Sequence, residues 1–184
     1  PARVLNLGCG PAWEVQRCLA ENDLSDRIQF TLLDFNEETL AHTRTLLNRA
    51  KLKHSRNTVV QCLKKSVNQI LKEGARTVEG SPQSKYDLVY CAGLFDYLSD
   101  QICQRLMNIL YSWVAPGGLL VATNVHVCNP RRLTMEYVME WNLIYRDRAQ
   151  MAALQPERAA ADDLFIISDE TGVNVYVEVR KPNN

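Results

Sequence analysis

Two glycines and a carboxylate near the start of the chain are the residues best suited to hold a ligand. An apolar run at 4–7 leads into Gly8 and Gly10, and Asp34 closes the next apolar run 24 positions after Gly10. Glycine lets the backbone approach a ligand closely because it has no Cβ. A carboxylate that ends the neighbouring strand can accept hydrogen bonds from both hydroxyls of a ribose. This spacing predicts a site for a cofactor that contains adenosine.

The residues after the second glycine argue against a dinucleotide. A dinucleotide-binding turn has a third glycine near the pyrophosphate, and this chain has Trp13 in that place. The segment 8–12, Gly-Cys-Gly-Pro-Ala, instead resembles motif I of the doubly wound S-adenosylmethionine-dependent methyltransferases. The resemblance implies S-adenosylmethionine as the cofactor, which has an adenosine and an amino-acid tail but no phosphate. The alternative is a strand-to-helix turn whose glycines serve packing alone.

One position departs from that motif. The family usually has Asp or Glu where this chain has Asn6. The carbonyl oxygen of Asn6 can still accept a hydrogen bond from an ammonium group, but it brings no charge. We assign Asn6, Gly8, Cys9 and Gly10 to cofactor binding.

Further cofactor contacts are expected beyond the carboxyl ends of the strands, where ligands of such sheets bind. Phe35 follows Asp34 and is placed to cover one face of the adenine. Capping of the next helix is the alternative role for Asp34, although Asn36 is better placed for it. Lys65 and Ser66 follow the third strand as candidate adenine contacts.

Ser66 departs from the family, which often has an acidic residue at this point, and its hydroxyl can instead cap the following helix. Cys91, Ala92 and Gly93 follow the fourth strand and resemble the motif beside the reactive methyl group. Small residues there leave room for the methyl donor and acceptor to meet.

The elements that must position these residues alternate between strand and helix. Apolar runs predict strands at 3–7, 28–33, 59–63, 87–91, 119–124, 164–168 and 173–180. Helical patterns cover 12–21, 37–51, 67–72 and 100–114, a surface loop is expected at 74–85, and a hairpin turn at 169–172.

Repeated βα units favour an α/β fold with a parallel sheet and helices on both faces. The Pro-Gly-Gly sequence at 116–118, before the fifth strand, is common in the same methyltransferases. The resemblance therefore implies a doubly wound, Rossmann-like sheet of seven strands in the order 3-2-1-4-5-7-6, with an antiparallel C-terminal strand.

Composition fits a single domain over 1–184, of which 46% of residues are hydrophobic. Because the first residues already belong to a core strand, we expect the natural chain to have a further N-terminal portion. Lys plus Arg equals Asp plus Glu at 21 each, which gives no field to attract nucleic acid. The six cysteines lack paired spacing and are expected to be reduced, with no metal site.

We found no signal sequence and no apolar run of about 18 residues, and so expect a soluble, cytoplasmic protein without integral membrane segments. The oligomeric state is left open.

The segment after the fifth strand is the expected substrate end. His126 follows that strand directly and is the candidate catalytic residue, as a general base toward a hydroxyl or amine or as a group that positions the substrate. A purely structural histidine is equally compatible with this place. Asn129, Arg132 and Tyr145 are further candidate substrate contacts. The pattern at 133–151 predicts an amphipathic helix over the cofactor mouth, unless its apolar stripe is core.

Three stretches, 94–100, 123–126 and 135–147, resemble a narrower bacterial group, the extracellular-factor type that makes 3-hydroxypalmitic acid methyl ester. That resemblance implies carboxyl O-methylation of a 3-hydroxy fatty acid, giving a fatty acid methyl ester. A carboxylate is ionised near neutral pH, so His126 would orient it rather than remove a proton. Two alternatives stay open, namely a methyltransferase of protein or nucleic acid and a non-catalytic S-adenosylmethionine-binding regulatory module.

Overall fold

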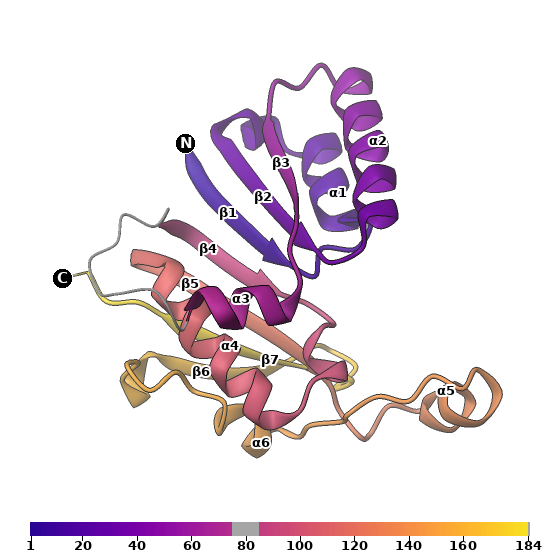
Figure 1. The fold of residues 1–184 in the computed structure, drawn as a ribbon, viewed down its shortest axis with the longest axis vertical. Coiled ribbons are helices and arrows are strands. Elements are labelled where there is room, and N and C mark those ends of the chain that lie inside the picture. The colour runs from indigo at the N-terminus through magenta and orange to yellow at the C-terminus, as the bar shows by residue number, and fades with distance from the viewer. Residues whose placement is uncertain (75–84, 184) are drawn as a thin grey trace.

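The computed structural model describes residues 1–74 and 85–183, and a seven-stranded sheet is its framework (Figure 1). The strand order is β3-β2-β1-β4-β5-β7-β6, as predicted. β1 to β5 pair in parallel, whereas β7 pairs antiparallel with both β5 and β6. The strands are β1 (Ala2–Leu7), β2 (Ile28–Asp34), β3 (Val59–Lys64), β4 (Tyr86–Cys91), β5 (Val114–Val125), β6 (Leu164–Ser168) and β7 (Asn174–Arg180).

Helices connect the parallel strands and lie on both faces of the sheet. The α-helices are α1 (Trp13–Glu21), α2 (Glu37–Lys53), α3 (Val67–Gly74), α4 (Asp100–Trp113), α5 (Arg132–Val138) and α6 (Arg148–Ala152). The described residues also form three short 3-10 helices, η1 (Asp23–Arg27), η2 (Phe95–Tyr97) and η3 (Ala161–Asp163). The predicted surface loop at 74–85 falls almost wholly on residues 75–84, which lie outside the described residues.

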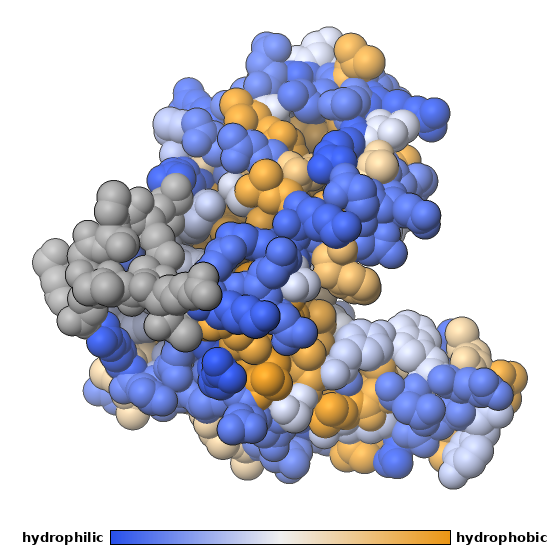
Figure 2. All heavy atoms as spheres, viewed as in Figure 1, coloured by the Kyte–Doolittle hydropathy of each residue, from blue (hydrophilic) through white to orange (hydrophobic). Residues whose placement is uncertain are grey.

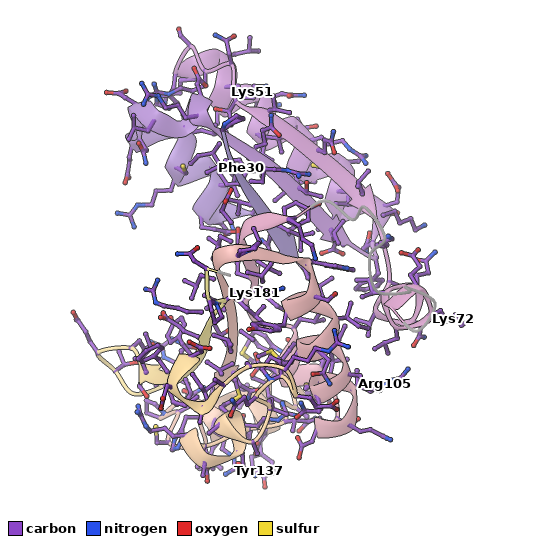
Figure 3. The ribbon with its side chains drawn as sticks, turned by 90° about the vertical axis from the view of Figure 1, so that its left-hand side faces the viewer. Phe30, Lys51, Lys72, Arg105, Tyr137 and Lys181 are labelled. Carbon is purple, nitrogen blue, oxygen red and sulfur yellow. The ribbon has the colours of Figure 1, made fainter. Side chains whose placement is uncertain are left out.

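Each face of the sheet has its own hydrophobic core. α1 and α2 pack on what we call the α1 face, where Val15, Leu19 and Leu40 meet Phe30 and Leu32. α3, α4 and α6 pack on the opposite, α4 face, whose fully buried side chains include the following: Ile70, Val89, Phe95, Leu106, Met107, Leu110, Leu120, Met151 and Val177. In Figure 3, Lys72 of α3 and Arg105 of α4 lie on the same side of the molecule.

The α1 face is less completely covered toward β5 and β7. There Tyr90, Val121, Thr123 and Tyr176 are half-buried, and they help to line a cavity of ≈ 430 Å³ beside α1. The cavity is predominantly apolar, and Glu14 is the one charged residue among the described residues that line it. This hollow reaches the carboxyl end of β4 at Cys91 and Ala92, beside the predicted site.

Two helix caps bear on the roles predicted for Asp34 and Ser66. The side chain of Asn36, and not that of Asp34, caps α2 by accepting from the backbone N–H groups of Glu38 at 2.9 Å and Thr39 at 3.1 Å. Asp34 is thereby left for another role. Ser66 caps α3, since its hydroxyl accepts from the backbone N–H of Gln69 at 3.2 Å.

The single helix predicted at 133–151 is wrong. α5 ends at Val138, the chain reverses where Glu140 takes a φ of 52°, and helix resumes only at α6. The backbone N–H of Trp141 donates to the carbonyl of Met135 at 2.8 Å, which closes the reversal. A continuous helix is excluded because the following residues must return to the sheet, where Arg146 is buried.

Candidate active site

The turn between β1 and α1 has three left-handed residues in alternation. Gly8, Gly10 and Ala12 have φ values of 72°, 48° and 51°. The backbone N–H groups of Gly8 and Cys9 donate to the carbonyl of Leu33 at 2.8 and 3.0 Å, which fixes the turn against the end of β2. Ala12 precedes α1 and is 1% exposed, so this strained non-glycine residue is held by packing. Sequence reasoning found the two glycines but not the strain at Ala12.

Asp34 links the turn to β2. Its Oδ2 accepts from the backbone N–H of Gly10 at 3.1 Å and its Oδ1 from that of Asn36 at 3.0 Å. Each carboxylate oxygen can accept a second hydrogen bond, so ribose hydroxyls remain possible partners. Phe35 lies next in sequence and is 67% exposed, a position suited to cover a flat ring.

Asn6 faces a carboxylate that sequence reasoning missed. Its Nδ2 donates to Glu14 Oε1 at 2.9 Å, and the hydroxyl of Tyr90 donates to the same oxygen at 2.6 Å. Burial, followed by the hydrogen bond and the charge of Glu14, raises the pKa of Tyr90 well above its ordinary value, so its hydroxyl stays protonated. The only signal for Glu14 in the sequence was its place in the first turn of α1.

The predicted adenine contacts at 65 and 66 have other partners in the structure. The Lys65 ammonium pairs with Glu73, and the backbone N–H of Lys65 donates to the carbonyl of Asp34 at 2.8 Å. The Ser66 hydroxyl is the helix cap described above. The backbone of this segment therefore lies beside Asp34, while both side chains are directed into α3.

The three residues after β4 divide between core and site. The thiol of Cys91 is fully buried, and burial raises its pKa, so we assign no chemistry to that side chain. Ala92 and Gly93 are exposed, and the backbone N–H of Gly93 donates to the hydroxyl of Thr123 at 3.1 Å. Burial, then the charge of Asp34, raises the pKa of Cys9 to about 12, so this thiol is also protonated at neutral pH.

His126 follows directly after the carboxyl end of β5. Its backbone N–H donates to the carbonyl of Val173 at 2.7 Å. The ring Nδ1 accepts from the backbone N–H of Cys128 at 3.1 Å. In the neutral ring the proton therefore sits on Nε2, which makes that nitrogen a donor.

The other predicted substrate residues meet one another in α5 and its flanks. The Arg132 guanidinium donates to Glu136 at 2.8 Å and lies 5.0 Å from the ring centroid of Tyr145. Asn129 accepts from the backbone N–H of Arg131 at 3.0 Å and organises the preceding turn. Figure 1 shows α5 at the end of an arm that projects from the carboxyl edge of the sheet, and Figure 2 shows a notch between this arm and the end of the sheet nearest α2. We call residues 126–147 the arm.

Two buried residues that sequence reasoning missed tie the arm to the sheet. Asp96 Oδ1 accepts from the backbone N–H of Val125 at 2.7 Å, and the Asp96 carbonyl accepts from the N–H of Ile144 at 2.7 Å. Arg146 is 1% exposed, and four groups accept from its guanidinium: Asp100 Oδ1, the carbonyls of Phe95 and Leu98, and Asn124 Oδ1. In the sequence, Arg146 has the appearance of an ordinary polar residue on a helix face.

Comparisons with known proteins found a matching family. The family described as "Methyltransferase domain" matches residues 5–120. No curated protein matched the sequence.

Solved structures of similar fold cover nearly the whole chain. A protein of Bordetella parapertussis named a possible exported protein has a TM-score of 0.74 at 20% identity, over 98% of this chain and 62% of its own. The S-adenosylmethionine-dependent methyltransferase SibL, in its apo form, has a TM-score of 0.67 at 19% identity, over 98% of this chain and 50% of its own. The N-methyltransferase NodS of Bradyrhizobium japonicum, solved with S-adenosylhomocysteine, has a TM-score of 0.59 at 15% identity, over 98% and 78%.

The chain thus spans between half and two thirds of the length of the first two structures. Across residues 1–74 and 85–183, no helix is long and apolar enough to cross a membrane. All six cysteines are free, and in the part of the chain that the structure describes no three His, Cys, Asp or Glu side chains gather where they could hold a metal ion.

Proposed function

Because the chain belongs to the methyltransferase domain family, matched over residues 5–120, we propose that it is an S-adenosylmethionine-dependent methyltransferase. The single observation that carries the proposal is the convergence of the Gly8–Gly10 turn and Asp34, joined by the hydrogen bond from the Gly10 N–H to Asp34 Oδ2. A ribose needs that carboxylate, and the neighbouring glycines admit the rest of the nucleoside without side-chain obstruction.

The residues present fit this cofactor. A Cβ built on Gly10 would meet nothing within 4 Å, so the backbone there borders open space. Asn6 Oδ1 is a buried acceptor that lacks a partner among the described residues, as expected for an atom that accepts from an ammonium group. Asp34 would hold the ribose, Phe35 would cover the adenine, and Ala92 and Gly93 would leave space at the methyl group. When bound, the cofactor supplies an electrophilic methyl group on a sulfonium sulfur.

For the acceptor we propose a small molecule or lipid acid, with carboxyl O-methylation of a 3-hydroxy fatty acid as the specific candidate. The state of His126 supports a carboxylate, because its Nε2 carries a proton and can donate to the oxygen that is not attacking. No general base is needed, since the carboxylate is already ionised. Catalysis then depends on aligning the attacking oxygen with the methyl carbon and the sulfur.

The test is cofactor binding by calorimetry. Asp34→Ala should weaken S-adenosylhomocysteine binding by roughly 1 to 3 kcal/mol, the cost of losing hydrogen bonds to a charged group. The matched control is Asp162→Ala, which removes an exposed carboxylate of η3 and should leave the affinity unchanged. NAD should not bind, because the turn offers no pyrophosphate cradle. Unchanged affinity in a folded Asp34→Ala variant, or saturable NAD binding at micromolar concentration, would contradict the assignment.

Measuring methyl transfer to different acceptors distinguishes an enzyme from a non-catalytic regulatory module. Methyl transfer to a small acid would support the enzyme, and transfer to protein or nucleic acid would favour the first alternative. Binding of S-adenosylmethionine with no transfer to any class of acceptor would favour a regulatory module.

A further inference from the structure

A buried polar atom in the candidate site lacks a hydrogen-bond partner. Asn6 is 3% exposed, and its Oδ1 has no partner among the described residues. Burying an amide oxygen without a hydrogen bond is costly, so such atoms in native proteins normally face a ligand or an ordered water. The partner must be a donor, because a carbonyl oxygen can only accept.

The carboxylate of Glu14 fixes the direction of that oxygen. Glu14 Oε1 accepts from Asn6 Nδ2 at 2.9 Å and from the Tyr90 hydroxyl at 2.6 Å. A carboxylate has no proton to donate, so the amide must present Nδ2 to Glu14 and turn Oδ1 away from it. The raised pKa of Tyr90 keeps that hydroxyl protonated, so it donates to the same Glu14 oxygen as Asn6 does.

The side chains of Asn6 and Glu14 lie on either side, in the sequence, of the Gly8–Gly10 turn that we propose binds the cofactor. Asn6 lies two residues before Gly8 on β1, and Glu14 is the second residue of α1. Glu14 is exposed and helps to line the cavity to which Tyr90 and Ala92 also contribute. A ligand seated on the turn therefore has the Asn6 carbonyl oxygen and a negative charge close together.

We propose that Glu14 is a positioning residue for the amino-acid tail of the cofactor, one that turns Asn6 Oδ1 toward the ammonium group and supplies the charge that Asn6 lacks. The inference rests on the proposed function and concerns the same site. Asn6 thus provides the accepting oxygen and Glu14 the negative charge, whereas a single carboxylate provides both where the motif has Asp or Glu. In this proposal Asn6 and Glu14 distinguish ligands by their amino-acid tail, whereas Asp34 binds the ribose that all adenosine-containing ligands have.

Calorimetry with two ligands tests this division. S-adenosylhomocysteine has the complete tail, whereas 5′-methylthioadenosine keeps the adenosine and thioether but has neither ammonium nor carboxylate. Asn6→Ala should weaken S-adenosylhomocysteine binding about tenfold or more, because it removes a hydrogen bond to a charged group. Glu14→Gln should weaken it about three- to fivefold, because the lost charge is exposed and partly screened. Neither change should alter the affinity for 5′-methylthioadenosine, whereas Asp34→Ala should weaken both ligands.

Two further variants make the test specific. Glu21→Gln removes an exposed carboxylate of the same helix that pairs with Arg17, and it should change neither affinity. Combining Asn6→Asp with Glu14→Gln moves the carboxylate to position 6 and should restore the affinity that Glu14→Gln loses. A third ligand, decarboxylated S-adenosylhomocysteine, keeps the amine and should report the same losses.

The outcomes separate the role of Glu14 from the assignment of the cofactor. Equal losses for both ligands in Glu14→Gln, no loss at all, or no recovery in the double variant would overturn the role of Glu14 while leaving the cofactor assignment intact. Failure of the unaltered protein to bind either ligand would overturn the proposed function, and with it this inference.

Discussion

The cofactor turn and the arm lie at the same edge of the sheet, but they are held there in different ways. The turn at 8–12 is fixed by short backbone bonds to the end of the adjacent strand and by Asp34. The arm leaves β5 at His126 and returns to the sheet at Arg146, where one guanidinium bonds to four groups. The turn is thus held by hydrogen bonds to the adjacent strand β2, whereas the arm is held to the sheet by the buried guanidinium of Arg146.

This difference suggests how the two halves of the site respond to change. The outer part of the arm packs little against the sheet, and Tyr137, Val138 and Met139 of α5 and its end are largely exposed. In Figure 3, Tyr137 lies at the bottom of the view, whereas Phe30, which belongs to the core beneath α1, lies in the upper half below Lys51. Substitutions in α5 should therefore be tolerated by the fold, whereas the buried anchor of the arm should not tolerate change.

The largest effect is expected at that anchor. Arg146→Met leaves the Asn124 amide oxygen and the carbonyls of Phe95 and Leu98 without their donor in a buried site. The free energy of unfolding should fall by about 3 to 5 kcal/mol, because several buried acceptors lose their donor at a cost of about 1 to 3 kcal/mol each. Urea unfolding followed by circular dichroism measures it.

The control is Arg105→Met, an exposed arginine of α4, which should change the free energy of unfolding by less than about 0.5 kcal/mol. Arg146→Lys should be intermediate, because an ammonium cannot reproduce the planar fork. If Arg146→Met proves as stable as Arg105→Met, the anchor does not hold the arm.

The strands and the turn between β1 and α1 could be predicted from the sequence because their signals are local. Each strand is a short apolar run, and Gly8, Gly10 and Asp34 stand at strand ends, where parallel topology brings them together. The strand order was implied by the resemblance and was confirmed. Glu14 was missed because its partners Asn6 and Tyr90 lie 8 and 76 positions away on β1 and β4, and only the folded sheet brings both to the first turn of α1.

The arm was predicted poorly for the same reason. Its apolar residues recur at helical spacing, yet the chain reverses at Glu140 so that Arg146 can reach groups 22 to 51 positions earlier. In the structure Arg132 bonds to Glu136, and its predicted contact with a substrate carboxylate stays a prediction. Contacts between distant polar residues decide this region, and periodicity does not report them.

The second-largest effect is expected on turnover, at His126, where the arm leaves β5. If the acceptor is a carboxylate, His126→Gln should lower kcat by less than about tenfold, because glutamine can still donate a hydrogen bond and no base is required. Steady-state kinetics with a 3-hydroxy fatty acid, at several pH values, measure this effect. A loss of several orders of magnitude, with a profile that rises through a pKa near that of histidine, would mean that His126 is a general base and that the acceptor is a hydroxyl or amine.

A smaller effect is expected where the arm would meet the substrate. Arg132 is already engaged by Glu136 and by the ring of Tyr145, so it must be shared with an incoming carboxylate. Arg132→Ala should raise KM about two- to fivefold without altering cofactor affinity, on the scale of exposed charge pairs. Glu136→Gln should lower KM, because it removes the competing carboxylate. Opposite changes in the two variants support the contact, and an unchanged KM in both excludes Arg132 from substrate binding.

The smallest expected effect is the pH dependence of stability at Asp96, the second residue that holds the arm. Burial raises the pKa of Asp96, although the Val125 N–H and the charge of Arg146 oppose that rise. The unfolded chain therefore loses this proton at a lower pH than the folded protein. Between the two pKa values the folded state binds more protons, so this group makes stability fall as pH rises. Asp96→Asn, whose amide oxygen can still accept from Val125, should flatten that part of the curve.

Asp169, in the turn between β6 and β7, should make stability depend on pH in the opposite direction. Its hydrogen bonds from Asn174 and Thr171 lower its pKa, so its contribution to stability is present above the ordinary carboxyl pKa and is lost as pH falls. Asp169→Asn should therefore reduce stability at neutral pH and have less effect in acid. Urea unfolding at closely spaced pH values measures both variants. If Asp96→Asn instead behaves like Asp169→Asn, then Asp96 is stabilised as a carboxylate, and the charge of Arg146 outweighs burial at the base of the arm.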